Sequence, residues 1–501
     1  MDSVERLAHA INVYRDSCGT LWVDAPVNRA LKLESAECRD YVTEKLLKEL
    51  GCKPTKQVID VLISKLRNTA RAGPTVEVPI RVAAIRAGSG FDLASGDKII
   101  LDLADLQGRV VEVSLQGAQL TTYRRVSFSR PPGLLPLPEP HLGDNVNVRQ
   151  ALAPILPFPG DDARTVVAAV WALTSLVPII PQPILMIVGE QGSGKSLLAK
   201  VLRELIDPNG SPLRRPPDSE RDLFIAGASS YVLAFDNLTG IQKHLSDALC
   251  AISTGGGYST RKLYTNDEEV VFTIRRPVII TSIDPVTVRP DFLDRTLLLE
   301  LSALPDKRPI LELEETHERC KARILGALLL SLQDALVARC FRRAEKLGDP
   351  HRLVDMHELA LMAAESEHFG WTPEVVDAAI RSNRDQVRQL AVDASPIISL
   401  VTELAREGFE GTATQLLTKL EALAPKIQAR RGDMPRSPEE LGRALAREEP
   451  ILRSRGVIVE KERGLAPARQ RLIKLSLDSA APVAAARRPV SLNPAHFAKR
   501  R

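Results

Sequence analysis

Aromatic residues, paired cysteines and net charge are all scarce in this sequence. Only 4% of its 501 residues are Phe, Tyr or Trp, which disfavours a function that needs several aromatic platforms for stacking bases. The six cysteines stand singly without a CxxC pair, so neither a disulfide framework nor a paired-thiolate zinc motif is indicated. The one ligand-like spacing, His317 with Cys320, has no second pair nearby and is interpreted as two ordinary helix residues.

No secretory leader is expected either. Charged side chains at Asp2, Glu5 and Arg6 interrupt the apolar residues at the start of the chain. Together with the single cysteines, this predicts a protein of the reducing cytoplasm.

No membrane span is expected, although one stretch is as long and uncharged as a membrane-spanning helix. Thr165–Gly189 carries no charge and is long enough to cross a bilayer. However, Pro178, Pro181 and Pro183 would stop a helix and remove backbone donors that hydrocarbon cannot replace. The sequence instead predicts a buried helix over 166–177 and a buried strand over 184–188.

The length and charge pattern suggest several domains, one of them basic. About three domains are expected at this length, and 44% hydrophobic with 26% charged residues is typical of globular proteins. The formal net charge is only +4, but residues 426–501 hold 18 basic and 8 acidic residues. This end is a candidate for binding a polyanion such as nucleic acid, and a solvated surface with a frayed tail is the alternative.

The first predicted domain, residues 1–144, is of the α+β class. Helical patterning gives way to alternating runs such as VEVPIRVAAIRA and RVVEVSLQG. The domain ends in a stiff connector over 130–144, where five prolines fall between Pro131 and Pro140.

The next two segments are predicted to be an α/β core and a helical region. Over 145–304, short apolar runs alternate with helix-length stretches, which indicates a parallel sheet covered on both faces. The four runs are ILMIV, YVLAF, PVIIT and LLLEL. Residues 305–394 show helical spacing and should form a lid or collar.

The last folded segment, 395–478, has the order helix, helix, helix, hairpin, which is the winged-helix pattern. Thr412 or Thr414 could cap its second helix. At the start of its third helix, Ser437 is the expected N-cap residue and Pro438 the first helical residue. Glu440 stands at the capping-box position. Residues 479–501 are predicted to be a basic disordered tail.

The strongest motif is a glycine-rich loop that follows an apolar strand and precedes a helical stretch. It satisfies the P-loop rule, in which glycines let backbone amides wrap phosphates and a lysine and a hydroxyl serve the phosphate oxygens and Mg²⁺. We therefore predict binding of ATP with Mg²⁺. The motif residues are Gly189, Glu190, Gln191, Gly192, Ser193, Gly194, Lys195 and Ser196.

A nucleotide site with a P-loop usually also has an apolar strand that ends in Asp. Val232 to Asp236 fits this description, and Asp236 would hold Mg²⁺ through water. The next residue is Asn237, where many ATPases have a catalytic Glu. An amide can orient a water but cannot take its proton, so hydrolysis would rely on another carboxylate or be slow.

The order of motifs from residue 183 to residue 301 resembles that of one ATPase group. The motifs are GEQGSGKS, LAFDN, CAISTGGGYSTRKLYTNDEE, RRPVIITSI and RPDFLDR. The chain is similar to AAA+ ATPases of the pre-sensor hairpin group, which includes superfamily 3 replicative helicases. It looks in particular like primase-associated helicase ATPases of phages, plasmids and integrated elements. The resemblance implies a hexameric ring that acts on single-stranded or forked DNA.

The resemblance also implies roles for a hairpin and a sensor. Strands over 258–264 and 269–274 would project into the pore, where Arg261 and Lys262 grip DNA phosphates; solvated hairpin charges are the alternative. Thr281 ends the VIIT strand at the position that touches the γ-phosphate or the attacking water, where the group often has Asn.

Two arginines match the position of arginine fingers, which complete the nucleotide site of a neighbouring subunit. They are Arg289 and Arg295, six residues apart in RPDFLDR. The alternative is structural, with Arg295 paired to an acid beneath the sheet.

Arginines in the predicted winged helix suit phosphate contacts better than base reading, because no Asn or Gln lies on the helix face that carries Arg443 and Arg447. A winged helix that docks protein is the alternative. The residues are Arg443, Arg447, Arg463, Arg469 and Arg471.

Two functions are favoured by these motifs, and a third is disfavoured. The first is an ATP-driven helicase or DNA-remodelling ATPase of a mobile genetic element, favoured by the hairpin and the paired arginines. The second is a nucleotide-gated switch that assembles on DNA or protein without unwinding, favoured by Asn237. A small-molecule kinase would need neither the hairpin nor a basic C-terminal domain. No primase cluster is visible before residue 144, so a primer-making partner would be a separate chain.

Overall fold

The computed structural model of the chain describes most of its residues, namely 2–86, 88, 96–122, 126–261, 269–283, 289–302, 308–341, 351–394, 396–424, 434–454, 456–463 and 471–477. By their contacts the residues form two compact units. The first comprises Met1–Asp284 and Leu297–Ile380, and the second Pro285–Thr296 and Arg381–Arg501. The domain bounds expected from the sequence stay predictions.

In the N-terminal part, one set of strands lies between the first and second helices, and a second set follows the third helix, where the alternating sequence pattern predicts strands. Ser35 and Thr55 cap two of the helices by accepting hydrogen bonds from backbone N–H groups. The strands form two sheets with the orders β1-β2-β3-β8 and β4-β5-β6-β7. The elements are α1 (Asp2–Ala10), β1 (Val13–Arg15), β2 (Leu21–Ala25), β3 (Arg29–Lys32), α2 (Ala36–Leu50), α3 (Lys56–Ala72), β4 (Val82–Ile85), β5 (Lys98–Asp102), β6 (Val110–Ser114), β7 (Gly117–Thr121) and β8 (Phe128–Ser129).

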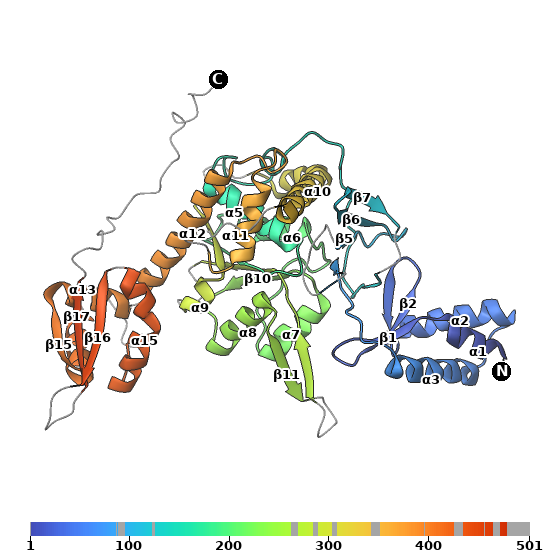
Figure 1. Ribbon diagram of the computed structural model, residues 1–501, viewed down its shortest axis with the longest axis horizontal. Helices are drawn as coiled ribbons and strands as arrows, with labels where there is room; N and C mark the ends of the chain where they lie inside the picture. The colour runs from blue at the N-terminus through green and yellow to red at the C-terminus, as the bar shows by residue number, and fades with distance from the viewer. Residues whose placement is uncertain are drawn as a thin grey trace. The chain divides into compact units, whose positions relative to one another are not determined.

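A four-stranded sheet lies at the centre of the first unit, and its strands are the four apolar runs predicted from the sequence. Their order is β10-β13-β9-β14, and β10, β13 and β9 are parallel. Figure 1 shows α7 and α8 on one side of β10 and α5, α6 and α11 on the other. The elements are α4 (Val148–Leu152), α5 (Ala163–Ser175), β9 (Ile184–Gly189), α6 (Lys195–Glu204), α7 (Glu220–Ser229), β10 (Leu233–Leu238), α8 (Lys243–Thr254), β13 (Val278–Ser282) and β14 (Thr296–Leu301).

The uncharged stretch over 165–189 forms a helix and a strand, which confirms the prediction from its prolines. Residues 165–175 of α5 and the first five residues of β9 are all buried. No helix among the described residues is both long and apolar enough to cross a membrane.

The outer edge of β10 is held by a single bridge rather than by a strand. Arg214 pairs with Phe235, so the backbone N–H of Asp236 donates to the Arg214 carbonyl oxygen at 2.9 Å. This bond fixes the main chain at the end of β10.

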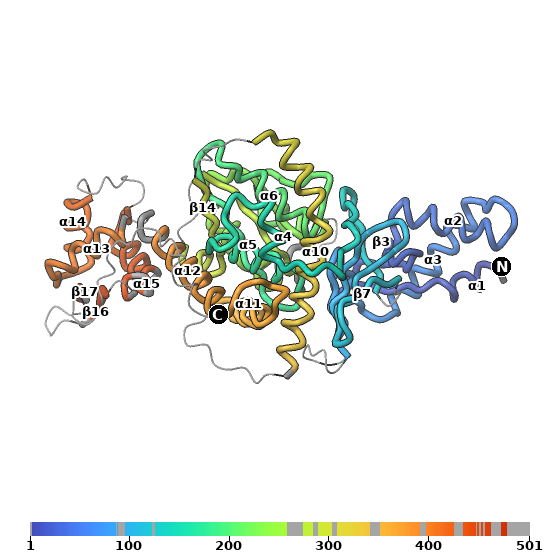
Figure 2. Tube along the Cα trace, turned by 90° about the horizontal axis from the view of Figure 1, so that it is seen from above, coloured from blue at the N-terminus to red at the C-terminus, as the bar shows by residue number. Residues whose placement is uncertain are grey.

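Three helices after residue 308 share one hydrophobic core with the sheet. Leu328, Met356 and Val376, one from each helix, belong to the same buried cluster as Leu185 of β9. Figure 2 shows α10 and α11 beside α5, which agrees with Figure 1. These helices therefore form part of the body of the first unit up to Ile380. They are α10 (Ile310–Phe341), α11 (Val354–Ala363) and α12 (Pro373–Ala394).

The second unit ends in three helices and a three-stranded antiparallel sheet of order β15-β17-β16. The predicted caps are confirmed: Thr412 forms a capping box with Gln415, and Ser437 accepts a hydrogen bond from the backbone N–H of Glu440. Strand β15 was not predicted. The elements are α13 (Pro396–Glu407), β15 (Phe409–Thr412), α14 (Ala413–Leu423), α15 (Pro438–Ser454), β16 (Val457–Arg463) and β17 (Arg471–Leu477).

A buried ion pair connects the N-terminal strands to the central sheet. Arg81, which precedes β4, and Asp207, which follows α6, are both fully buried, with Nε and Oδ1 3.2 Å apart. The other Asp207 oxygen accepts hydrogen bonds from the backbone N–H groups of Tyr231 and Val232, each at 3.0 Å. Asp207 therefore holds the start of β10 as well as the arginine.

We expect Arg81→Met to lower the free energy of unfolding by about 3–5 kcal/mol, because it leaves the Asp207 carboxylate buried without its cation. Lys48→Met is the control, since Lys48 forms an exposed pair with Glu44 and should cost at most about 1 kcal/mol. Denaturant unfolding measures both. Similar small losses in the two variants would contradict the structural role of the buried pair.

Candidate functional site

The glycine-rich loop connects the end of β9 to the start of α6. Gly192 and Gly194 have φ of 82° and 87°, a backbone conformation that favours glycine. A Cβ on Gly189 would lie 2.3 Å from the Leu301 carbonyl oxygen of β14. The loop conformation and its close approach to β14 therefore both require these glycines.

The N-terminus of α6 has no side-chain cap. Its N-cap residue is Gly194, which has no side chain to accept a hydrogen bond from the first-turn N–H groups. Free N–H groups and the positive end of the helix dipole attract an anion. The same turn carries Lys195, whose Nζ donates to the carbonyl oxygens of Gly189 and Glu190 at 2.7 Å each.

Three side chains from different elements meet where the parallel strands end. Ser196 of α6 donates its hydroxyl to Oδ1 of Asp236 at 2.8 Å, and the Thr281 hydroxyl donates to the same oxygen. Asp236 lies near the end of β10 and Thr281 near the end of β13, and these strands are parallel neighbours. The carboxyl edge of the sheet thus brings together residues 40 and 45 positions apart.

Asn237 has a left-handed backbone, with φ of 57°. The pairing of β10 with β13 shifts register between Phe235 and Leu238, and the Asn237 N–H donates to the Thr281 hydroxyl oxygen at 2.9 Å. Asn tolerates this conformation better than most residues with a Cβ. Its side chain is exposed at the edge of the sheet.

This arrangement fits the phosphates of a nucleotide with Mg²⁺. The magnesium ion is usually bound through one or two carboxylates together with substrate phosphates. Asp236 and the Ser196 hydroxyl offer oxygen ligands for the metal, while the Lys195 ammonium and the uncapped helix terminus suit the phosphates. Among the described residues, no cluster of three or more His, Cys, Asp or Glu side chains offers a metal site made by protein alone.

The two predicted arginine fingers flank a short helix of the second unit, α9 (Pro290–Leu293). Arg289 is its N-cap residue and is half-buried. Arg295 donates through Nη1 to the carbonyl oxygen and to Oδ1 of Asp291, each at 2.6 Å, and its side chain is only 12% exposed. Arg295 is therefore paired with an acid, though with one in the short helix that precedes it rather than beneath the sheet. The finger roles stay predictions.

The predicted hairpin is present in the backbone. Strands β11 (Gly257–Arg261) and β12 (Glu269–Thr273) pair antiparallel, with Arg261 opposite Glu269. The Arg261 side chain and the whole of Lys262 lie outside the described residues, so their DNA contacts stay predictions.

The basic residues of the second unit are described only in part. Arg443 is exposed on α15, and its Nε donates to the Glu439 carbonyl oxygen at 3.5 Å. Arg463 and Arg471 face each other in the register of β16 with β17. The side chains of Arg447, Arg463 and Arg471, the whole of Arg469 and the predicted tail over 479–501 lie outside the described residues.

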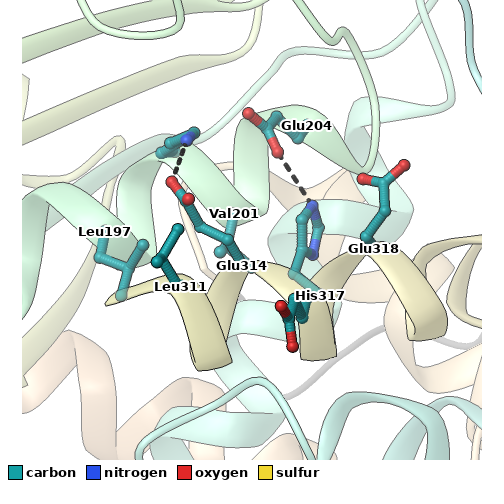
Figure 3. Close-up of a pocket in the computed structure, with 9 residues that line it drawn as sticks. Leu197, Val201, Glu204, Leu311, Glu314, His317 and Glu318 are labelled. Atoms are coloured by element: carbon teal, nitrogen blue, oxygen red, sulfur yellow. Dashed lines mark hydrogen bonds and ion pairs between the residues drawn. The ribbon is translucent and has the colours of Figure 1, made fainter. Parts of the chain in front are cut away.

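A separate pocket lies between α6 and α10 (Figure 3). Glu204 and His317 point toward one another across it at 3.1 Å, and Lys200 pairs with Glu314 at 2.6 Å. Burial raises the pKa of Glu204, but the interactions with His317, Lys200 and Lys321 together outweigh burial, so the net shift of this pKa is downward. With Glu315 and Glu318 also in its wall, the pocket is too acidic for a phosphate. His317 here serves an ion pair, consistent with its interpretation as a helix residue.

Two family models match the chain. Residues 154–365 match the actinomycete integrative conjugative element replication protein, and residues 394–488 match the C-terminal domain of AICE RepA. Each match covers less than half of the chain, and together they show that these two segments are similar to replication-protein domains of such elements. The comparison with curated proteins gives no match.

Solved structures are similar at low identity, and one of them is titled a helicase. The apo A form of the NrS-1 C-terminal region is 12% identical, with 94% of this chain and 98% of that chain covered and a TM-score of 0.39. A full-length MCM homolog from Methanopyrus kandleri is 15% identical, with 62% and 77% covered and a TM-score of 0.33. JCV helicase is 13% identical, with 46% and 70% covered and a TM-score of 0.20. Such low TM-scores decide neither fold nor function.

We expect Asn237→Ala to be less stable than Asn237→Gly by about 1 kcal/mol, because alanine disfavours the left-handed backbone. The control is the same pair of substitutions at Ser64, an exposed position inside α3, where glycine should be the less stable by about 1 kcal/mol. Thermal or denaturant unfolding measures the differences. If alanine were the more stable residue at both positions, Asn237 would not have a left-handed backbone.

Proposed function

We propose that this chain is an ATP-driven DNA helicase or DNA-remodelling ATPase that acts as a hexameric ring in the replication of an integrative conjugative element. The observation that carries the proposal is the meeting of Lys195, Ser196 and Asp236 at the carboxyl edge of a parallel sheet. The matched family models support a role in replication, since both describe the replication protein of such elements.

The loop residues would bind the nucleotide. Backbone N–H groups of the loop and of the α6 N-terminus surround the phosphates, and Lys195 leaves the carbonyl oxygens of the loop to neutralise the β and γ oxygens. When bound, Mg²⁺ draws charge from the phosphate oxygens. Ser196 and Asp236 are the residues that would hold it, because they already meet at hydrogen-bond distance.

The second unit and the hairpin would bind DNA. Arg261 and Lys262 are expected to grip a strand, and the arginines of the C-terminal segment to contact phosphates. Arg289 and Arg295 would complete the nucleotide site of a neighbouring subunit. The protein would act in the cytoplasm, with a primer-making partner, where one is needed, on a separate chain.

A nucleotide-gated switch is the second candidate function, and Asn237 favours it. No carboxylate stands at this position, and an amide cannot take a proton from water. A switch would bind ATP tightly, assemble on DNA or on a partner protein, and turn over slowly without unwinding.

Lys195→Ala should lower ATP turnover about 100-fold or more, because it removes the cation that faces the phosphates. Asp236→Ala should keep metal-free nucleotide binding and lose Mg²⁺-dependent turnover. Lys200→Ala is the matched control, since Lys200 lies on the same helix but pairs with Glu314 outside the site. Phosphate release and binding of a fluorescent nucleotide measure these effects. Wild-type turnover in Lys195→Ala would show that the loop is not the nucleotide site.

Arg289→Ala and Arg295→Ala should each lose turnover in a way that mixing restores. A finger acts on the nucleotide of its neighbour, so a finger variant with an intact loop should regain part of its activity beside Lys195→Ala subunits. Turnover at several mixing ratios, with assembly followed by light scattering, measures the rescue. Absence of rescue with intact assembly would make these arginines structural or active within their own subunit.

A further inference from the structure

Two neighbouring hydroxyls near the end of β13 differ in their hydrogen bonds. Thr281 and Ser282 are both buried, with exposed fractions of 1% and 0%. The Thr281 hydroxyl bonds to Asp236 and to the Asn237 backbone. The Ser282 hydroxyl has no hydrogen-bond partner in the part of the chain that the structure describes. The strand therefore offers a functional candidate and a matched control side by side.

The Thr281 hydroxyl has already used the hydrogen that a phosphate would need. A hydroxyl carries one hydrogen and two acceptor lone pairs. Its hydrogen is donated to Oδ1 of Asp236, and one lone pair accepts the Asn237 N–H at 2.9 Å. The ionised oxygens of a phosphate accept hydrogen bonds and cannot donate one. Thr281 could bind a phosphate oxygen only by releasing Asp236.

The two bonds of Thr281 hold the irregular end of β10. The pairing of β10 with β13 breaks register at this point, and Asn237 has a left-handed backbone there. Asp236 is also bonded to the Ser196 hydroxyl, so its carboxylate is held between α6 and β13. Without the Thr281 hydroxyl, the Asn237 N–H would lose its acceptor. The Asp236 carboxylate would lose one of its two hydroxyl donors.

We infer that Thr281 is a positioning residue, which fixes the Asp236 carboxylate and the Asn237 backbone for metal binding and does not read the γ-phosphate. The inference rests on the proposed nucleotide site and refines it. A residue that positions a metal-binding carboxylate affects metal affinity, whereas a residue that touches the γ-phosphate affects the preference for ATP over ADP.

The test compares Thr281→Val, Thr281→Ser and Ser282→Ala in the full-length chain. Valine matches the shape of threonine without a hydroxyl, and serine keeps the hydroxyl. Each variant is titrated with ATP and with ADP in a fluorescent-nucleotide competition assay, with and without Mg²⁺. Turnover is then measured across a range of Mg²⁺ concentrations, and thermal unfolding checks the fold.

Thr281→Val should raise the Mg²⁺ concentration for half-maximal turnover about 10- to 100-fold, the usual effect of losing a residue that orients a metal ligand. Its metal-free affinities for ATP and ADP should stay unchanged, and its ratio of ATP to ADP affinity with Mg²⁺ should equal that of the wild type. Thr281→Ser should restore the wild-type Mg²⁺ requirement, and Ser282→Ala should not change it.

Two results would overturn this inference and leave the proposed function standing. One is a Thr281→Val chain with the wild-type Mg²⁺ requirement, and the other is a selective loss of ATP affinity over ADP affinity, which would mean that Thr281 reads the γ-phosphate. If Thr281→Val does not fold, Thr281→Ala removes the same hydroxyl and gives the same comparison. A wild-type chain without Mg²⁺-dependent binding or turnover would instead overturn the proposed function, and this inference with it.

Discussion

The carboxylate of Asp236 is the point on which the candidate site depends. It accepts hydroxyl hydrogen bonds from α6 and from β13, while its own backbone N–H is held by Arg214 at the edge of the sheet. These bonds tie the glycine-rich loop, the end of β10 and the end of β13 into one arrangement. The start of β10 is fixed separately, by the buried pair of Asp207 with Arg81. Both ends of this strand are thus set by ionisable groups.

Much of the central fold could be predicted because the strands of a covered parallel sheet are short, continuous apolar runs. All four runs form the expected strands, and the prolines after α5 end that helix as predicted. Strand β15 was missed because Phe409–Thr412 is short and pairs with β17, about sixty residues later. The sharing of one core by the sheet and α10 to α12 depends on contacts between distant residues, which periodicity does not reveal.

The candidate site was predictable as a set of residue types but not as a set of bonds. The loop rule locates Lys195 and Ser196, and an apolar strand ending in acid locates Asp236. That Thr281 donates to Asp236, and that Asn237 has a left-handed backbone, follows from the register shift between β10 and β13. The pairing of Arg295 with Asp291 depends on the short helix that contains Asp291 and ends just before Arg295. The roles of the fingers, the hairpin and the C-terminal arginines stay predictions.

Unwinding of a forked DNA by the purified chain tests the central claim most directly. Strand separation is followed with ATP and Mg²⁺, with a non-hydrolysable ATP analogue, and with the double variant Arg261→Ala, Lys262→Ala. An ATP-driven helicase separates the fork with ATP only, and the double variant keeps basal ATP turnover but loses unwinding. The contradicting result is a chain that binds the fork equally well with ATP and with the analogue but does not separate its strands. That result would favour the nucleotide-gated switch over the helicase function.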